Sequence, residues 1–152
     1  MLGFCSLLEK MLTHAATEGI DTDFKHSAHR VHRYFSTAAM LHHEDEEQDL
    51  FTLLASQSAE MATTIHELKQ DHIKLEEAWN KLEPFLARPS SIEGSEAFSQ
   101  TVNDFCSAYR THIKKEEAGL LAMAEPMLST KQLKAIGNSM KARRQPNRSD
   151  DD

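Results

Sequence analysis

Apolar residues recur every three or four positions along most of the 152-residue chain, and no stretch of useful length alternates as a β-strand would. This spacing places the apolar side chains on one face of a helix. The five glycines and four prolines leave long runs uninterrupted. The spacing therefore predicts an all-α fold of a few long helices.

The breaks in this pattern predict four long helices. The first covers residues 2–17, and the second runs from 22 or 23 to 56–58. The third ends before Pro89, and the fourth follows the Pro- and Ser-rich segment 88–95 and ends at Pro126. Four helices with short connections most simply form an antiparallel up-down-up-down bundle. We expect residues 1–128 to form this bundle.

The C-terminal segment predicts one further element. Ser129, with Gln132 three positions later, matches a capping box, so a short fifth helix is expected over residues 129–144. The acidic end that follows predicts a disordered tail over residues 145–152.

Composition excludes several kinds of partner. A formal net charge of −7 disfavours nucleic acid, because phosphate contacts need a clustered basic face. No run approaches the length of apolar residues that a membrane span needs, and the N-terminus lacks the basic region of a signal peptide. We therefore expect a cytoplasmic protein without membrane contact, and nothing in the sequence identifies a protein partner.

Histidine and glutamate occupy several positions within the rows of apolar residues that are predicted to face the core. His43 and Glu47 lie four positions apart on the second helix, and His112 and Glu116 repeat this spacing on the fourth. Residues four apart share a helix face, so each pair points toward the interior. His72 occupies the apolar stripe of the third helix. A lone histidine is more often a hydrogen-bonded core residue, but buried carboxylates need a partner or a metal.

The positions of these residues along the helices support a shared site. Glu47 and His72 lie equally far from the predicted connection at 56–62, and His72 and His112 lie equally far from segment 89–95. In antiparallel neighbours, such residues are level along the bundle. The sequence therefore predicts that inward imidazoles and carboxylates meet at one height.

The types of ligand indicate the metal. Imidazole with carboxylate suits iron or manganese, and the absence of inward thiolates argues against zinc-finger or iron–sulfur chemistry. Cys5 and Cys106 match no metal or redox spacing. Their similar distances from the connecting loops put them near one level on neighbouring helices, where a disulfide is an option.

Three segments resemble the metal-binding helices of hemerythrin-like (HHE cation-binding) domains: HHEDEEQDLF, QDHIKLEEAW and HIKKEEAGLLAMA. The resemblance covers about residues 41–125, with a weaker match over 4–35. It implies a non-haem iron centre, normally di-iron with an oxo or hydroxo bridge, that binds oxygen. The iron ligands that it implies are His43, Glu47, His72, His112 and Glu116.

Two further carboxylates are candidate ligands by the same resemblance. Glu44 follows His43 directly, where some family members carry a bridging carboxylate, although an ideal helix turns it about 100° away from His43. Glu76 lies four residues after His72, where other hemerythrins have a second histidine.

The first helix lacks a histidine at the height of His43. The level position would lie upstream of Met1, and His14 is some 25 Å too close to the first loop. In the family the corresponding ligand precedes a motif like Phe4-Cys5, which would suit a chain that begins late. We expect one iron with an open coordination position and incomplete occupancy.

The sequence is compatible with three functions. The first is a binding protein, not an enzyme, for dioxygen, another small diatomic or peroxide, or for iron itself, with an oxidase or peroxidase side activity left open. The second is a ferritin-like di-iron oxidase, whose sites use Glu-x-x-His, the reverse of the order seen here. The third is a metal-free helical scaffold.

Overall fold

The computed structural model describes residues 1–92 and 95–144, and over these residues it is all-helical, without a strand. The predicted tail, residues 145–152, lies outside the described residues, as does part of the predicted loop, residues 93–94. None of the described helices combines the length and apolar character that a bilayer crossing requires.

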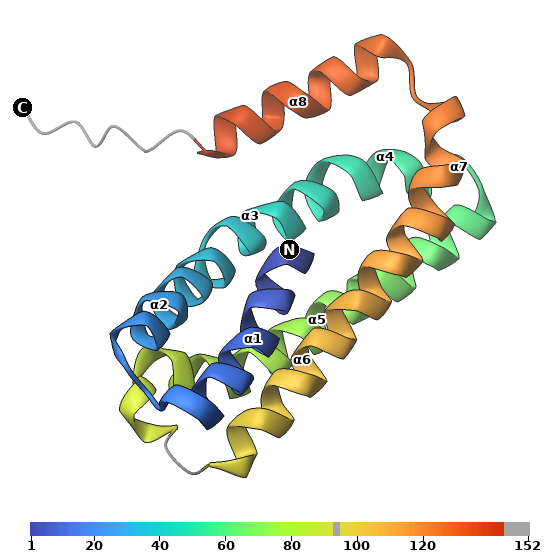
Figure 1. The fold of residues 1–152 in the computed structure, drawn as a ribbon. Coiled ribbons are helices and arrows are strands. Elements are labelled where there is room, and N and C mark those ends of the chain that lie inside the picture. The colour runs from blue at the N-terminus through green and yellow to red at the C-terminus, as the bar shows by residue number, and fades with distance from the viewer. Residues whose placement is uncertain (93–94, 145–152) are drawn as a thin grey trace, which may run out of the picture.

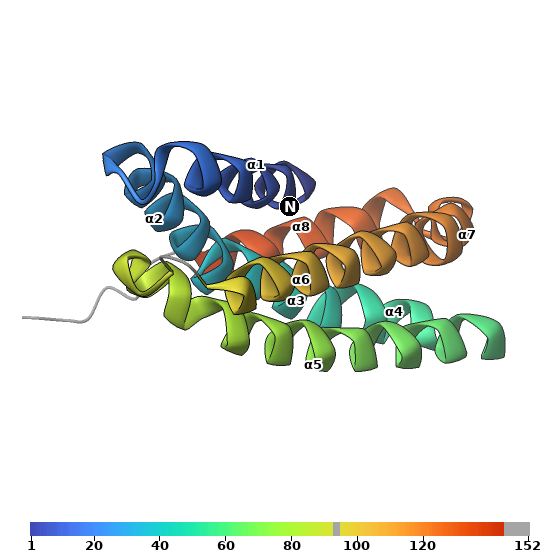
Figure 2. The ribbon, with the colours of Figure 1, turned by 60° about the horizontal axis from the view of Figure 1, so that its bottom comes forward.

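The helices form rods that lie side by side, as Figures 1 and 2 show. The first rod is α1 (Leu2–Glu18), and the third is α5 (Ala59–Ala87). The second rod consists of α2 (Thr22–Ser36), α3 (Ala38–Asp45), the π-helical turn η1 (Glu46–Leu50) and α4 (Phe51–Ala55). The fourth consists of α6 (Glu96–Lys115), the π-helical turn η3 (Glu116–Leu121), α7 (Ala122–Ala124) and the 3₁₀ turn η4 (Glu125–Met127).

A glycine and three short polar residues lie where the rods begin or end. Gly19 takes a positive φ of 76° after α1, which glycine adopts without steric cost. Asp21 caps α2, one residue before the earlier of the two predicted starts, and accepts a hydrogen bond from the backbone N–H of Phe24. The side chains of Ser58 and Ser95 cap α5 and α6 in the same way.

The second rod differs from the single helix that the sequence predicted. The backbone breaks at Thr37, with φ −129° and ψ −78°, and η1 interrupts the rod again from Glu46. A π-helical turn contains one extra residue, which rotates the following side chains by about 100° relative to a continuous α-helix. Phe51 is accordingly fully buried, whereas Leu50 is half-buried.

The core is divided into two apolar clusters. The larger cluster joins α1, α2, α5 and α6 around Phe35 and Phe105, and the smaller one joins α4, α5 and η3 around Phe51 and Leu120. His72 lies between Leu68 of the smaller cluster and Leu75 of the larger cluster along α5. A polar layer therefore separates the two clusters.

The last helix, α8 (Thr130–Arg144), lies outside the rods, along α3 and η1. The predicted capping box is confirmed: Gln132 Oε1 accepts from the N–H of Ser129 at 2.9 Å, and Ser129 Oγ accepts from the N–H of Gln132 at 3.2 Å. The short C-terminal helix thus begins where the sequence placed it.

Cys5 and Cys106 are neighbours in the contact between α1 and α6. Both are buried free thiols, and Cys106 Sγ donates to the carbonyl oxygen of Cys5 at 3.6 Å. Hydrogen bonding by the Cys106 thiol is the largest influence on the pKa of Cys5 and lowers it. These contacts leave the disulfide option open.

We predict that diamide links Cys5 to Cys106 within one chain. The two thiols lose two hydrogens and two electrons, and the diazene bond of the reagent is reduced to a hydrazine. Closure of so long a loop should stabilise the fold by up to about 4 kcal/mol. Thiol titration, non-reducing mass spectrometry and the melting temperature measure this, with Cys106→Ser as the control. Retention of both thiols in folded protein would contradict the prediction.

Candidate metal centre

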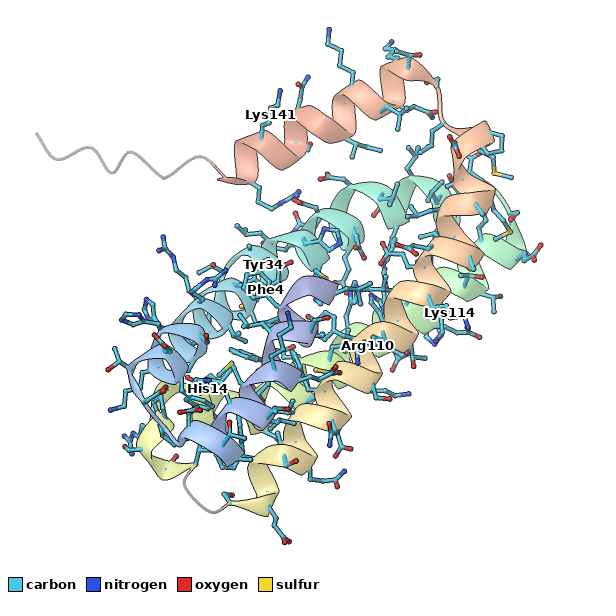
Figure 3. The ribbon with its side chains drawn as sticks, in the orientation of Figure 1. Phe4, His14, Tyr34, Arg110, Lys114 and Lys141 are labelled. Atoms are coloured by element: carbon cyan, nitrogen blue, oxygen red, sulfur yellow. The ribbon has the colours of Figure 1, made fainter. Side chains whose placement is uncertain are left out.

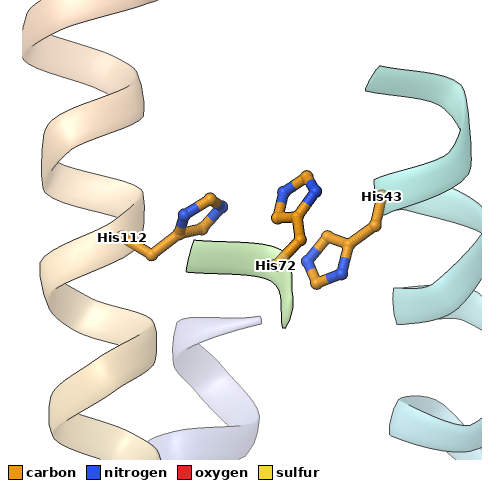
Figure 4. A group of neighbouring side chains, drawn as sticks. All are labelled: His43, His72 and His112. Carbon is orange, nitrogen blue, oxygen red and sulfur yellow. The ribbon is translucent and has the colours of Figure 1, made fainter. Parts of the chain in front are cut away.

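Three histidines from three rods converge in the polar layer. His43 comes from α3, His72 from α5 and His112 from α6, and Figure 4 shows their rings turned toward one another. One ring nitrogen of each lies within 4.8 Å of the others. Ligands of one ion are separated by at most about 4.2 Å at a bond length of about 2.1 Å, so a small contraction would suffice to bind a metal.

The imidazole rings are closely packed: His43 stacks on His72, and His112 is inclined to both. The centroids of His43 and His72 are 4.0 Å apart with an interplanar angle of 15°, and those of His72 and His112 are 4.8 Å apart. Phe51 stacks on His72 at 5.8 Å. The aromatic packing restricts the rotation of the imidazoles and so preorganises their nitrogens.

A second group lies beside the three histidines. His42, Glu46 and Glu116 each offer one atom within 4.8 Å of the other two. Glu46 and Glu116 are 2% and 8% exposed. Glu46 connects the two groups, since one carboxylate oxygen contacts His42 Nε2 and the other lies 3.3 Å from His72 Nε2.

Several buried polar atoms in these groups lack a properly oriented hydrogen bond within the described part of the chain. They are His43 Nε2, His72 Nε2, His112 Nε2 and both carboxylate oxygens of Glu46. Ion-pair contacts with His42, His72 and Glu116 compensate four of these atoms in part, which leaves His43 Nε2 the least satisfied. Buried polar groups normally have full hydrogen bonds, and the shortfall costs free energy unless an ion or water meets them. Their convergence fits a bound cation.

Carboxylates contact the Nδ1 atoms of two of these rings, on the side of the ring away from Nε2. Glu47 Oε1 lies 2.8 Å from His72 Nδ1, and Asp71 Oδ2 lies 3.4 Å from His112 Nδ1. Lys115 donates to the same Asp71 oxygen at 2.8 Å. Histidine ligands of metals commonly donate their other ring N–H to a carboxylate, which fixes the tautomer and leaves Nε2 free.

The electrostatics of the imidazoles differ within the group. Burial, followed by the charge of His72, lowers the pKa of His43 to about 3. Burial and His72 also lower the pKa of His112. For His72, burial acts in the same direction, but hydrogen bonds to Glu46 and Glu47 outweigh it and raise the pKa. His43 is therefore neutral at pH 7, the form that binds a metal.

The two buried carboxylates are electrostatically linked. Burial, then hydrogen bonding and charge repulsion from Glu46, raises the pKa of Glu116 to about 8. Burial opposes ionisation of Glu46 as well, but hydrogen bonds from His42 and His72 hold its pKa below the usual range. A cation between these carboxylates would remove the repulsion and displace the proton of Glu116.

The structure places the predicted site residues in different surroundings. His43, His72, His112 and Glu116 belong to the two groups. Glu47 contacts His72, as its distance from the connection implied, but its side chain is 42% exposed. Glu44 is exposed and accepts a hydrogen bond from Gln48, and Glu76 is exposed at the rim of the cavity described below.

Sequence reasoning missed Glu46, His42 and Asp71. Glu46 lies four residues after His42 and three after His43, so it reaches the same interior from a neighbouring position. The signal was present: HHEDEE contains His-x-x-x-Glu-Glu starting at His42, and HIKKEE repeats it starting at His112. An ideal helix would turn only His43 inward, whereas the break at Thr37 and the π-helical turn at Glu46 alter the phase of this rod.

A cavity of about 360 Å³ opens beside the three histidines. Its walls include Phe35, Met40, His43, His72, Trp79 and Tyr109. A second cleft, of about 470 Å³, lies beside His42 and Glu116 and is bordered by Met1, Tyr34 and Leu121. Both groups are therefore accessible to small molecules.

His14 lies away from both groups. Its Nε2 is 2.8 Å from Asp21 Oδ1, at the turn between α1 and α2, and Figure 3 shows it at the far end of α1. This placement agrees with its predicted distance from the site.

The sequence matches the family described as hemerythrin HHE cation-binding domain over residues 1–124. The chain belongs to the hemerythrin family. It is also 32% identical over 142 residues to an uncharacterized protein of Haemophilus influenzae, covering 93% of this chain and 82% of that protein. The hemerythrin match includes both candidate ligand groups and ends before α8.

Proposed function

We propose that this hemerythrin binds non-haem iron at two adjacent subsites inside an antiparallel up-down-up-down four-helix bundle. The observation that carries the proposal is the convergence of three imidazoles and two buried carboxylates in the polar layer, with His43 Nε2, His72 Nε2, His112 Nε2 and both Glu46 oxygens lacking a well-oriented hydrogen bond among the described residues. Their mutual contacts leave two carboxylates facing each other in a buried layer, which is costly, whereas a cation would satisfy the imidazoles and the carboxylates together.

The two groups of side chains define the proposed ligands. His43, His72 and His112 would hold one ion, and His42, Glu46 and Glu116 would hold the other. Glu46 would bridge the ions, because its two oxygens face His42 and His72. We propose Glu47 as the carboxylate that orients His72, or as an additional ligand after a side-chain rotation, and Glu76 as an outer carboxylate.

The composition of the groups favours iron. Imidazole and carboxylate oxygen suit iron and manganese, and both cysteines lie in the contact between α1 and α6 instead of in either group. Two thiols that are free also fit the reducing conditions of the cytoplasm, where we propose that the protein acts.

The bound partner is proposed to be small. Dioxygen, another diatomic molecule or peroxide could reach the histidines through the cavity of about 360 Å³, which has Phe35 and Trp79 in its walls. Iron would supply an open coordination position and redox chemistry for such a ligand. The cleft beside His42 and Glu116 is where we propose the vacant position of the second iron, facing the start of α1.

Binding, not catalysis, is the proposed role. A ferritin-like oxidase is the alternative from the enzyme class, and its Glu-x-x-His order differs from the His-x-x-x-Glu order at His42 and His112. A metal-free scaffold would leave His43 Nε2 without a hydrogen bond from any described residue and the carboxylates of Glu46 and Glu116 facing each other in the polar layer.

We predict that protein purified from iron-supplied cells contains up to two irons per chain. The oxidised protein should absorb in the near ultraviolet through ligand-to-iron charge transfer, and azide should change that spectrum because it enters a vacant position. Metal analysis and optical titration measure both. Absence of stoichiometric metal and of this absorption would refute iron binding. Turnover of ferrous iron with oxygen at enzymatic rates would favour the oxidase instead.

A further inference from the structure

One arginine from outside the hemerythrin match reaches the metal-binding turn. Arg143 of α8 donates to Asp45, and its two terminal nitrogens lie 3.0 and 2.9 Å from Asp49 Oδ2. It also donates to Gln48 Oε1 at 3.3 Å. These contacts join positions 94 to 98 residues apart, so they depend on tertiary structure alone.

These partners surround the proposed bridging residue. Asp45 directly precedes Glu46, and Gln48 and Asp49 lie within the same π-helical turn η1. Asp45 and Asp49 lie four residues apart, so they share one side of the helix. His42 and His72 contact Glu46. Arg143 thus holds one side of η1 while the proposed ligands occupy the other.

The contacts of Arg143 are desolvated. Its side chain is 17% exposed, and those of Asp45 and Asp49 are 2% and 14% exposed. Charge-assisted hydrogen bonds in such surroundings are stronger than those at an open surface. Segment 44–49 contains five acidic residues, so a guanidinium also offsets their mutual repulsion.

We propose that α8 acts as a clamp on the metal centre, with Arg143 as the positioning residue that holds η1 and thereby Glu46. The hydrogen bonds of Arg143 go to Asp45, Gln48 and Asp49, and it acts on Glu46 through these residues. The clamp is a property of the folded chain with or without metal, and its effect on iron rests on the proposed function. Toward its N-terminal part, α8 is separated from α4 and η1 by a cleft of about 420 Å³, lined in part by Thr52 and Ile136.

The test compares Arg143→Gln with Lys141→Gln in the full chain. Both variants remove one positive charge from α8, but Lys141 is exposed and points away from the rods in Figure 3. In metal-free protein, Arg143→Gln should speed hydrogen exchange of the η1 amides by at least about tenfold. Exchange in α1 and the first half of α6 should not change, and Lys141→Gln should resemble wild type.

The iron-loaded variants provide the second readout. Arg143→Gln should release iron to a ferrous chelator faster than Lys141→Gln and shift the charge-transfer absorption, and Arg143→Lys should restore part of both. If Arg143→Gln fails to fold, Asp49→Asn tests the same contact from η1, with a smaller effect of the same sign. Equal exchange and equal iron release in the Gln variants would overturn the clamp. Faster η1 exchange with no iron in any variant would support the clamp and refute the iron proposal.

Discussion

His112→Ala is expected to lose most of the bound iron. The substitution removes one of three convergent imidazoles and leaves the orienting carboxylate Asp71 paired with Lys115. Loss of a group that only orients a metal ligand costs 10- to 100-fold in affinity, so loss of a ligand should cost at least about 100-fold. Iron content after gel filtration and the near-ultraviolet absorption measure the effect.

His26→Ala is the matched control for this substitution. His26 is exposed on α2 and belongs to neither ligand group. Both variants should keep the far-ultraviolet circular dichroism of the wild type, because neither side chain belongs to the apolar clusters. Equal iron retention in the two variants would refute the assignment of His112 as a ligand.

Glu46→Gln is expected to abolish binding at the subsite of His42, Glu46 and Glu116 and to weaken the other. The neutral amide cannot bridge two cations as the carboxylate does, and the affinity for the second iron should fall by at least about 100-fold. Isothermal titration with ferrous iron under nitrogen would resolve the two steps.

The same substitution has a metal-free readout. Burial first and Glu46 second raise the pKa of Glu116 to about 8. Removing the negative charge of Glu46 favours the ionised form of Glu116, so the pKa of Glu116 should move down toward its usual value. Side-chain carboxyl NMR during a pH titration measures this shift.

Glu44→Gln controls for the loss of one acidic charge in the same segment. Glu44 is exposed and contacts Gln48, so both iron steps and the pKa of Glu116 should match the wild type. A wild-type pKa of Glu116 in Glu46→Gln, or similar iron losses in the two Gln variants, would refute the central role of Glu46.

Local patterns predicted the helices well because they depend on nearby residues. The stripe of α5 is buried at Ile65, Leu68, His72 and Leu75, as its spacing required. The Ser129 capping box formed where its short-range chemistry predicted, and the first helix ends at Glu18, one residue after its predicted limit. Family membership followed from the same short motifs.

The sequence by itself determined the all-helical class, the faces that are buried and the presence of imidazoles and carboxylates in the interior, since all three follow from helical periodicity and burial cost. Tertiary structure decided which carboxylate reaches the centre. The break at Thr37 and the π-helical turn at Glu46 alter the phase of the second rod, and an ideal helix contains neither. Packing of α8 then brought Arg143 to Asp45 across 98 residues, a contact that no local pattern encodes.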